Sequence, residues 1–186
     1  GDYFLSKTKA EKTAWDFMES DGMKNKLTTN NPGGVFGDAL DKKGGTSIEY
    51  IRQFLKGKFP AAPKFAVLIS DVMDVAKSHI ACIDNKNVGG RRLIVGKEVK
   101  KLVELSQIMA DAMPEYSKKL PKKELPNFMV KLISYLDSSA KTMIPDLGII
   151  MQTDTTYAEE LLGFKFKPAK DCIIENAKSV VKLGLV

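Results

Sequence analysis

The sequence predicts an α/β protein, because short strand candidates alternate with segments of helical periodicity along its 186 residues. Three strands are expected, at residues 27–31, 65–69 and 92–95. Alternation of this kind is typical of parallel strands joined by crossover connections. Three strands are too few for the sheet of an ordinary α/β enzyme. We therefore expect the remaining strands to lie upstream of this sequence.

Six helices are expected, and most have a start or stop signal. Gly22 ends the first, Thr46 and Ser47 are candidate caps for a helix over 48–56, and Pro114 ends a helix that starts at Glu98. Residues 71–84, 125–137 and 170–183 form the others, and Pro32-Gly33-Gly34 should break the first strand. The positions expected to face inward are Val72, Val75, Ala76, His79, Ile80 and Ile83; Val99, Leu102, Val103, Met109 and Met113; Phe128, Met129, Leu132, Ile133 and Leu136; and Ile173, Ile174, Ala177, Val180 and Val181.

Composition excludes several classes of protein. The apolar fraction is 44% and no apolar run is long enough to cross a bilayer, so we expect a globular cytoplasmic protein without a membrane partner. The net charge is +6, but lysines are mixed with acids and not interleaved with aromatic residues, which argues against nucleic acid. Cys82 and Cys172 are unpaired by spacing and, with the single His79, predict free thiols and no metal site. Packing is favoured over a Cys82–His79 nucleophile pair.

Tyr3 and Lys7 carry the clearest chemical signal. They lie four residues apart at a helix start, so one helical turn brings a phenol and an ammonium to the same face. A phenol with a pKa near 10 exchanges protons poorly at neutral pH, and a nearby ammonium favours the phenolate. The pair therefore predicts acid–base chemistry. The spacing is weak by itself, because an exposed tyrosine and a solvated lysine would show it too.

Four motifs in order strengthen that hypothesis. Residues 3–12 (YFLSKTKAEK) resemble the Tyr-x-x-Ser-Lys-x-x-Ala-Glu signature of the extended short-chain dehydrogenases/reductases. Residues 31–37 (NPGGVFG) are similar to their Asn-Pro-x-x-Val-x-Gly turn, and residues 71–79 (DVMDVAKSH) to their Asp-Val-Arg-Asp-Val-Ala-x-Ala-His helix. Residues 158–164 (AEELLGF), with Pro168, resemble the element before their final helix. Met73 replaces the usual Arg of the third motif and Ser78 the usual Ala, so any contact of that Arg is lost.

The resemblance implies a fold and a reaction. It implies the carboxy-terminal portion of a Rossmann-fold enzyme of this family, closest to the dihydroflavonol-reductase-like aldehyde and ketone reductases, with a small and mostly helical substrate domain. Residues 1–33 and 65–97 would close the NAD(P)-binding domain, and residues 34–64 and 98–186 would form the substrate domain. The parent enzyme would reduce a small carbonyl substrate with hydride from NADP or NAD, with NADP slightly favoured.

The resemblance also implies residue roles. Tyr3 would be the general acid, and Lys7 would hold the nicotinamide ribose and favour the phenolate. Pro32, Gly33, Gly34 and Val35 would pass beside the nicotinamide, unless they form a plain strand-ending turn. Ser47 would either reach the cofactor phosphates or only cap its helix. Asp74 and His79 are interpreted as structural, the first as a cap and the second as a packed, hydrogen-bonded residue.

Some expected elements are missing. The glycine-rich loop that cradles the pyrophosphate is not found, so the chain is expected to be a fragment that is inactive alone and needs a homo-oligomer or the missing amino-terminal half. One alternative is a sugar-nucleotide epimerase or dehydratase with the same Tyr3 and Lys7. The scarcity of arginine argues against it, because Arg52, Arg91 and Arg92 are the only ones in the sequence. The other alternative is a non-catalytic fragment.

Overall fold

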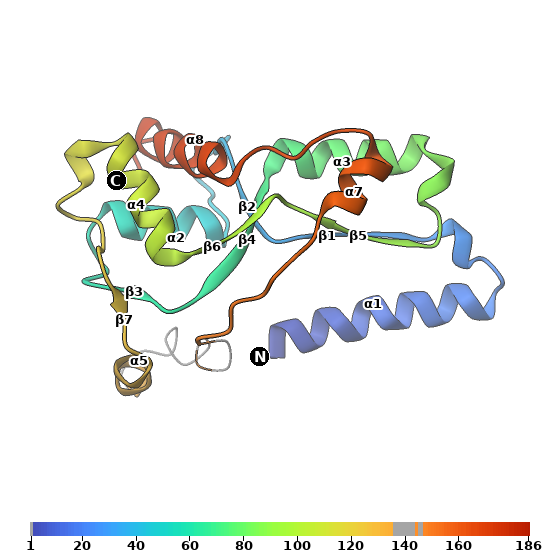
Figure 1. Cartoon of the computed structure of the whole chain (residues 1–186), viewed down its shortest axis with the longest axis horizontal. Coiled ribbons are helices and arrows are strands. Elements are labelled where there is room, and N and C mark those ends of the chain that lie inside the picture. Colours follow the sequence, from blue (N-terminus) through green and yellow to red (C-terminus); the bar gives the residue numbers. More distant parts are fainter. Residues whose placement is uncertain (1, 136–143, 145–146) are drawn as a thin grey trace.

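The computed structural model describes residues 2–135, 144 and 147–186 and has a mixed α/β fold, as the sequence predicts (Figure 1). Among the described residues three small sheets form, with strand orders β1-β5, β2-β4-β6 and β3-β7. The strands are β1 (Thr28–Pro32), β2 (Gly34–Phe36), β3 (Ala62–Pro63), β4 (Ala66–Asp71), β5 (Arg91–Val95), β6 (Glu98–Lys101) and β7 (Glu124–Leu125). The α-helices are α1 (Asp2–Ser20), α2 (Thr46–Leu55), α3 (Val72–Asp84), α4 (Leu102–Ala112), α5 (Asn127–Ile133), α7 (Thr156–Leu162) and α8 (Ala169–Lys182), and 3-10 turns cover Lys24–Lys26, Lys86–Val88 and Pro114–Tyr116.

The β1–β5 pair lies between helices. Figure 1 shows α1 along one side of this parallel pair, with α3 and α7 on the other. On the side of the pair that faces α3 and α7, buried apolar side chains form a cluster. This smaller core cluster consists of Val88, Leu93, Val95, Ala158, Leu162 and Phe166.

The chain passes directly from the first sheet into the second. Pro32 ends β1 and Gly34 begins β2, so Gly33 alone separates the two strands. The predicted break in the strand is confirmed at Gly33, but the second strand that follows at once, β2, was not predicted. The backbone stays extended because β2 finds a new parallel partner in β4, with Val35 opposite Ser70.

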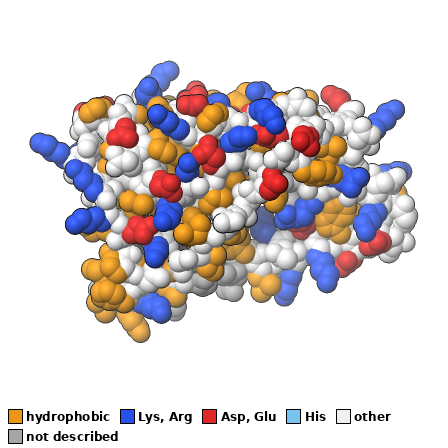
Figure 2. Space-filling view, viewed as in Figure 1, with side chains coloured by type: hydrophobic (Ala, Val, Ile, Leu, Met, Phe, Trp, Pro, Cys, Tyr) orange, Lys and Arg blue, Asp and Glu red, His pale blue; other side chains and the backbone are white. Residues whose placement is uncertain are grey.

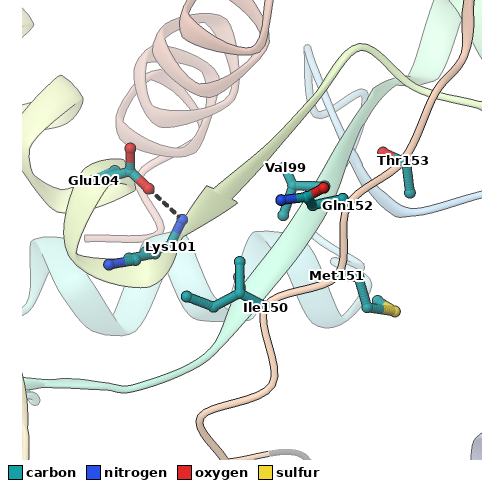
Figure 3. A pocket seen from close by; sticks show the side chains of 8 residues that line it. Val99, Lys101, Glu104, Ile150, Met151, Gln152 and Thr153 are labelled. Carbon is teal, nitrogen blue, oxygen red and sulfur yellow. Dashed lines mark hydrogen bonds between the residues drawn. The ribbon is translucent and has the colours of Figure 1, made fainter.

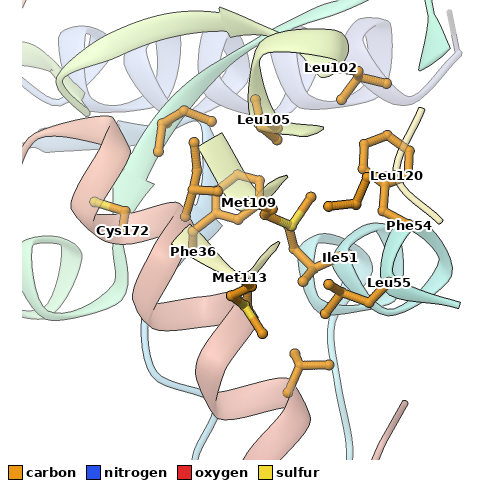
Figure 4. Packing of buried hydrophobic residues seen from close by; sticks show 14 of the residues in the cluster. Phe36, Ile51, Phe54, Leu55, Leu102, Leu105, Met109, Met113, Leu120 and Cys172 are labelled. Atoms are coloured by element: carbon orange, nitrogen blue, oxygen red, sulfur yellow. The ribbon is translucent and has the colours of Figure 1, made fainter. Parts of the chain in front are cut away.

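A larger core cluster fills the space between α2, α4, α8 and the second sheet. Figure 4 shows Phe36 of β2 among Met109 and Met113 from α4 and its end, with Ile51 and Phe54 of α2 close by. The predicted inward face of α8 is confirmed, since Ile173, Ala177 and Val180 are fully buried in this cluster. Burial of large apolar side chains of this kind is the main favourable term in folding.

The segment predicted as the start of the fourth helix is a strand. Residues 98–101 form β6, antiparallel to β4 with Val99 opposite Leu68, and α4 begins only at Leu102. Backbone hydrogen bonding to β4 overrides the helical periodicity here. From Leu102 the prediction is confirmed, because Leu102 and Met109 are buried and α4 ends before Pro114.

The predicted inward face of α3 is confirmed for Val75, which packs against the smaller core cluster, and is wrong for Ala76, His79, Ile80 and Ile83. The buried residues of this helix are Asp74 and Ser78, whereas Ile83 is 83% exposed and Ile80 is also exposed. Polar groups can be buried here because each is hydrogen-bonded: Asp74 Oδ2 accepts from the Lys167 backbone N–H at 2.6 Å, and Ser78 Oγ donates to the Val75 carbonyl at 2.7 Å. Ile80 and Ile83 therefore lie open among the described residues.

The predicted inward face of α5 is wrong as well. Phe128 is 70% exposed, Met129 and Leu132 are also exposed, and Val130 is the buried residue. The helix is short, and Figure 1 shows it at the edge of the molecule beyond β7. Figure 2 shows hydrophobic side chains gathered in the same lower-left region. Leu136, the last residue of the predicted face, lies outside the described residues.

Glu159 fixes α7 to the chain that follows β5. This buried carboxylate accepts hydrogen bonds from Lys97 Nζ at 2.6 Å, from the Phe166 backbone N–H at 2.9 Å and from Lys165 Nζ at 3.0 Å. Burial alone would raise the pKa of Glu159, but these three donors outweigh it and lower the pKa from 4.5 to about 2.

A Glu159→Gln variant should therefore lose stability in a pH-dependent way. The folded pKa is depressed, so the contribution of the carboxylate is present above pH 4.5 and is lost as pH falls towards 2. We expect a loss of about 2 kcal/mol at pH 7, shrinking steadily below pH 4.5. Urea unfolding at pH 7, 4 and 2.5 measures it, with the exposed neighbour Glu160→Gln as control. A pH-independent difference would contradict the assignment.

No helix within the described part of the chain combines the length and the apolar character needed to cross a membrane.

Candidate active site

The first two turns of α1 present Tyr3 and Lys7 together. Lys7 Nζ lies 5.7 Å from the centroid of the Tyr3 ring, within the range of a cation–π contact. Ser6 Oγ donates to the Tyr3 carbonyl at 2.7 Å, inside the same turn. Tyr3 is 67% exposed and Lys7 is also exposed. The helical spacing read from the sequence therefore brings the phenol and the ammonium together on an accessible surface.

Glu11 aligns α1 with the first sheet. Its Oε1 accepts from Arg92 Nε at 2.8 Å, from Thr29 Oγ1 at 3.0 Å and from Trp15 Nε1 at 3.3 Å. Burial raises the pKa of Glu11, but hydrogen bonds from Arg92, Thr29 and Trp15 lower it overall. The carboxylate thus stays charged and joins the middle of α1 to β1 and β5.

This junction sets which end of β1 lies beside the start of α1. Figure 1 shows α1 and β1 running in opposite directions. Tyr3 precedes Glu11 by eight residues, about 12 Å of helix rise. Pro32 follows Thr29 by three residues, about 10 Å of strand. Measured from the Glu11–Thr29 hydrogen bond, Tyr3 and Pro32 are therefore displaced along the sheet in the same direction and by similar lengths.

The Pro32–Val35 segment, called the Pro32–Val35 turn after the motif it resembles, is extended and is held by β4. The Gly33 backbone N–H donates to Ser70 Oγ at 2.8 Å. A Cβ on Gly33 would overlap the carbonyl oxygen of Leu68, and one on Gly34 would lie 2.9 Å from Val67 Cγ2. The close approach that glycine permits in this turn is therefore towards β4, a structural reason for both residues.

Ser47 lies apart from this turn in the chain, in the first turn of α2. The N-cap of α2 is Gly45, so Thr46 and Ser47 are helical residues and the predicted helix start is too late. Ser47 is half-buried. Among the hydrogen bonds of the described residues, none joins Ser47 to Tyr3, Lys7 or Gly33.

The two residues interpreted as structural have other partners than expected. Asp71 is the cap of α3, accepting from the backbone N–H groups of Met73 and Asp74, so the expected cap at Asp74 is wrong. His79 has the expected hydrogen bond, 2.7 Å to the Val75 carbonyl, but it is exposed instead of packed. The reason is the rotation of α3, which buries the Asp74 side and not the His79 side.

The two cysteines are free thiols, as predicted. Cys82 Sγ donates to Asn30 Oδ1 at 3.6 Å, and burial raises its pKa. Cys172 is buried, and burial raises the pKa of its thiol to about 12. Both therefore remain protonated at neutral pH, which disfavours a thiolate nucleophile. In the described ranges no group of His, Cys, Asp and Glu side chains could hold a metal ion.

A cavity of about 430 Å³ opens between β6 and residues 150–153 (Figure 3). Its apolar lining consists of Ala66, Val99, Ile150 and Met151, and its polar lining of Lys101, Glu104, Gln152 and Thr153. The Glu104 carboxylate accepts from the Lys101 backbone N–H at 2.7 Å, which fixes this wall at the start of α4. It is largely open to solvent, unlike the enclosed pockets that bury most of a small molecule.

The fold is similar to that of Rossmann-fold short-chain dehydrogenases/reductases. No family model matches the chain. It is 30% identical over 191 residues to the NADPH-dependent methylglyoxal reductase GRE2 of Saccharomyces cerevisiae, covering 97% of this chain and 51% of that protein. It is 26% identical over 182 residues to cinnamoyl-CoA reductase 2 of Arabidopsis thaliana, covering 98% and 48%.

Solved structures agree. The crystal structure of Gre2 from Candida albicans in complex with NADPH is similar with a TM-score of 0.68 and 28% identity, covering 94% of this chain and 49% of that chain. The predicted resemblance to the extended short-chain dehydrogenases/reductases is confirmed. The chain spans about half the length of the curated relatives it matches, in agreement with the predicted resemblance to only a part of such enzymes.

Proposed function

We propose that the full-length protein containing this chain is an NADPH-dependent oxidoreductase that reduces an aldehyde or ketone. The observation that carries the proposal is the Tyr3–Lys7 pair, exposed and 5.7 Å apart by the ring-to-ammonium distance, in a chain similar to NADPH-dependent reductases. The comparable displacement of Tyr3 and Pro32 along β1 supports a single site formed by the start of α1 and the Pro32–Val35 turn.

In this proposal Tyr3 is the general acid. NADPH, when bound, would supply hydride to the carbonyl carbon. The phenol of Tyr3 would donate its proton to the carbonyl oxygen, which completes the alcohol. The Lys7 ammonium stabilises the phenolate that remains. In the reverse direction the phenolate accepts the proton. The exposed face of both side chains fits a ligand that approaches from solvent.

The other residues of the site bind the cofactor. Lys7 donates hydrogen bonds to the ribose hydroxyls next to the nicotinamide. Pro32, Gly33, Gly34 and Val35 form the wall beside that ring. Ser47, in the first turn of α2, contacts a cofactor phosphate, since helix starts favour anions.

The domain division follows the same proposal. Residues 1–33 and 65–97 close the cofactor-binding domain, and residues 34–64 and 98–186 form the substrate domain. The two core clusters do not follow this division, because Ile69 packs in the larger cluster with residues of the substrate domain. In this division α7 is the substrate domain's contact with β5, because Ala158 and Leu162 pack in the cluster of Leu93 and Val95.

A substrate with an apolar body is favoured. The cavity beside β6 offers Val99, Ile150 and Met151 as apolar contacts, and such contacts supply most of the surface that a small-molecule pocket buries. The screen that tests the proposal offers apolar, aromatic and small dicarbonyl substrates to the full-length protein with NADPH and with NADH. We expect net oxidation of NADPH, followed by its absorbance. Turnover of sugar nucleotides without net oxidation would replace the reductase proposal with the epimerase alternative.

A further inference from the structure

Ser70 lies where the two sheets meet. It is fully buried on β4, opposite Val35 of β2, whereas Val95 of β5 lies opposite Pro32 of β1. Its Oγ accepts from the Gly33 backbone N–H at 2.8 Å and donates to the Val95 carbonyl at 2.6 Å. One hydroxyl therefore connects the turn to both neighbouring strands.

A hydroxyl is needed for this arrangement. Gly33 belongs to neither strand, so its N–H has no ladder partner and must be satisfied in another way. A serine hydroxyl can accept one hydrogen bond and donate another at once, which an alanine or valine cannot do. Gly33 and Gly34 also approach Leu68 and Val67 of β4 closely, so the hydroxyl fixes a turn that already lies against that strand.

We propose that Ser70 is a positioning residue for the nicotinamide end of the cofactor. This inference rests on the proposed function, in which Pro32 to Val35 line the nicotinamide. Ser70 touches neither cofactor nor substrate in this scheme. It acts through Gly33, by holding the turn in its bound shape before the cofactor arrives. A preformed wall does not have to be ordered on binding, so affinity is higher.

The test measures cofactor affinity and turnover separately in the full-length protein. Ser70→Ala should raise the Kd for NADPH by about tenfold. This is the effect expected when one hydrogen bond that orders the turn is lost. Titration of NADPH fluorescence gives Kd without turnover. The KM for NADPH should rise in parallel, whereas kcat at saturating NADPH should change less than about threefold, because Tyr3 and Lys7 are untouched.

The matched control is Ser106, a second buried serine whose Oγ donates to the Pro121 carbonyl at 2.6 Å. Ser106→Ala should lose comparable stability and keep the wild-type Kd. If Ser70→Ala does not fold, Ser70→Cys keeps the volume with a weaker donor and should show a smaller rise in Kd.

The outcomes are distinguishable. A folded Ser70→Ala or Ser70→Cys protein with wild-type Kd would overturn the role of Ser70 and leave the reductase proposal intact. A rise in Kd that Ser106→Ala shares would also overturn it, since that effect would be general. A wild-type protein that binds no NADPH would overturn the proposed function and this inference with it.

Discussion

Tyr3→Phe is expected to lower kcat of the full-length protein by about two to four orders of magnitude, the contribution of a positioned general acid. The phenol oxygen is the only group removed, and the ring that Lys7 contacts stays in place. The Kd for NADPH should therefore change little. Single-turnover measurements with saturating NADPH separate the chemical step from binding and product release.

Lys7→Ala should behave differently. In the proposed mechanism the ammonium both contacts the cofactor ribose and stabilises the Tyr3 phenolate, so kcat should fall and the Kd for NADPH should rise. The two variants together distinguish a residue of the chemical step from one that also binds cofactor.

Tyr157→Phe is the matched control, because Tyr157 is a second exposed tyrosine, on α7, without a role in the proposal. It should keep wild-type kcat. Near-full activity of Tyr3→Phe would show that the proton comes from another group, and the proposed mechanism would be wrong.

The sequence predicted elements well wherever local pattern and tertiary packing agree. In α8 the apolar residues at helical spacing are also the buried ones, so Ile173, Ala177 and Val180 could be identified directly. In α3 the two disagree. Ile80 and Ile83 face outward, and Asp74 is buried through a hydrogen bond from Lys167, which lies 93 residues further along the chain. Periodicity contains no information about such a partner.

In the candidate site, too, local pattern could be predicted and tertiary contacts could not. Tyr3 and Lys7 could be predicted because one helical turn determines their separation. Ser70 could not, since the predicted strand ends at residue 69 and Ser70 falls between it and the motif at residues 71–79. A polar residue within a buried strand is the signal that could have identified it, because a buried hydroxyl requires a partner.

Lys167 joins α3 to α8 through two carboxylates, Asp71 at the cap of α3 and Glu175 on α8. Its Nζ lies 3.1 Å from Asp71 Oδ2 and 2.7 Å from Glu175 Oε2. The Asp71 side chain is 1% exposed, whereas that of Lys167 is 29% exposed. Burial alone lowers the pKa of Lys167, but hydrogen bonds to Glu175 and Asp71 raise it overall. Asp71 also caps α3, so its carboxylate both pairs with Lys167 and accepts hydrogen bonds from the first backbone N–H groups of the helix.

Lys167→Met should therefore destabilise the protein by about 2–3 kcal/mol, somewhat below the cost of breaking a fully buried ion pair because Lys167 is partly exposed. The loss arises mainly because Asp71 keeps a buried charge without its cation. Adding Asp71→Asn to Lys167→Met removes that charge while leaving an oxygen for the cap, and should recover part of the loss.

Urea unfolding of the wild type, both single variants and the double variant gives the coupling energy between Asp71 and Lys167. Lys24→Met is the control, because Lys24 and its partner Glu19 are both more than half exposed. It should cost less than about 0.5 kcal/mol. The Lys167 effect should also persist at 1 M salt, since buried pairs are screened little. Additive single effects would mean that Lys167 acts through its packing or its bond to Glu175, and that Asp71 is stabilised by the α3 backbone alone.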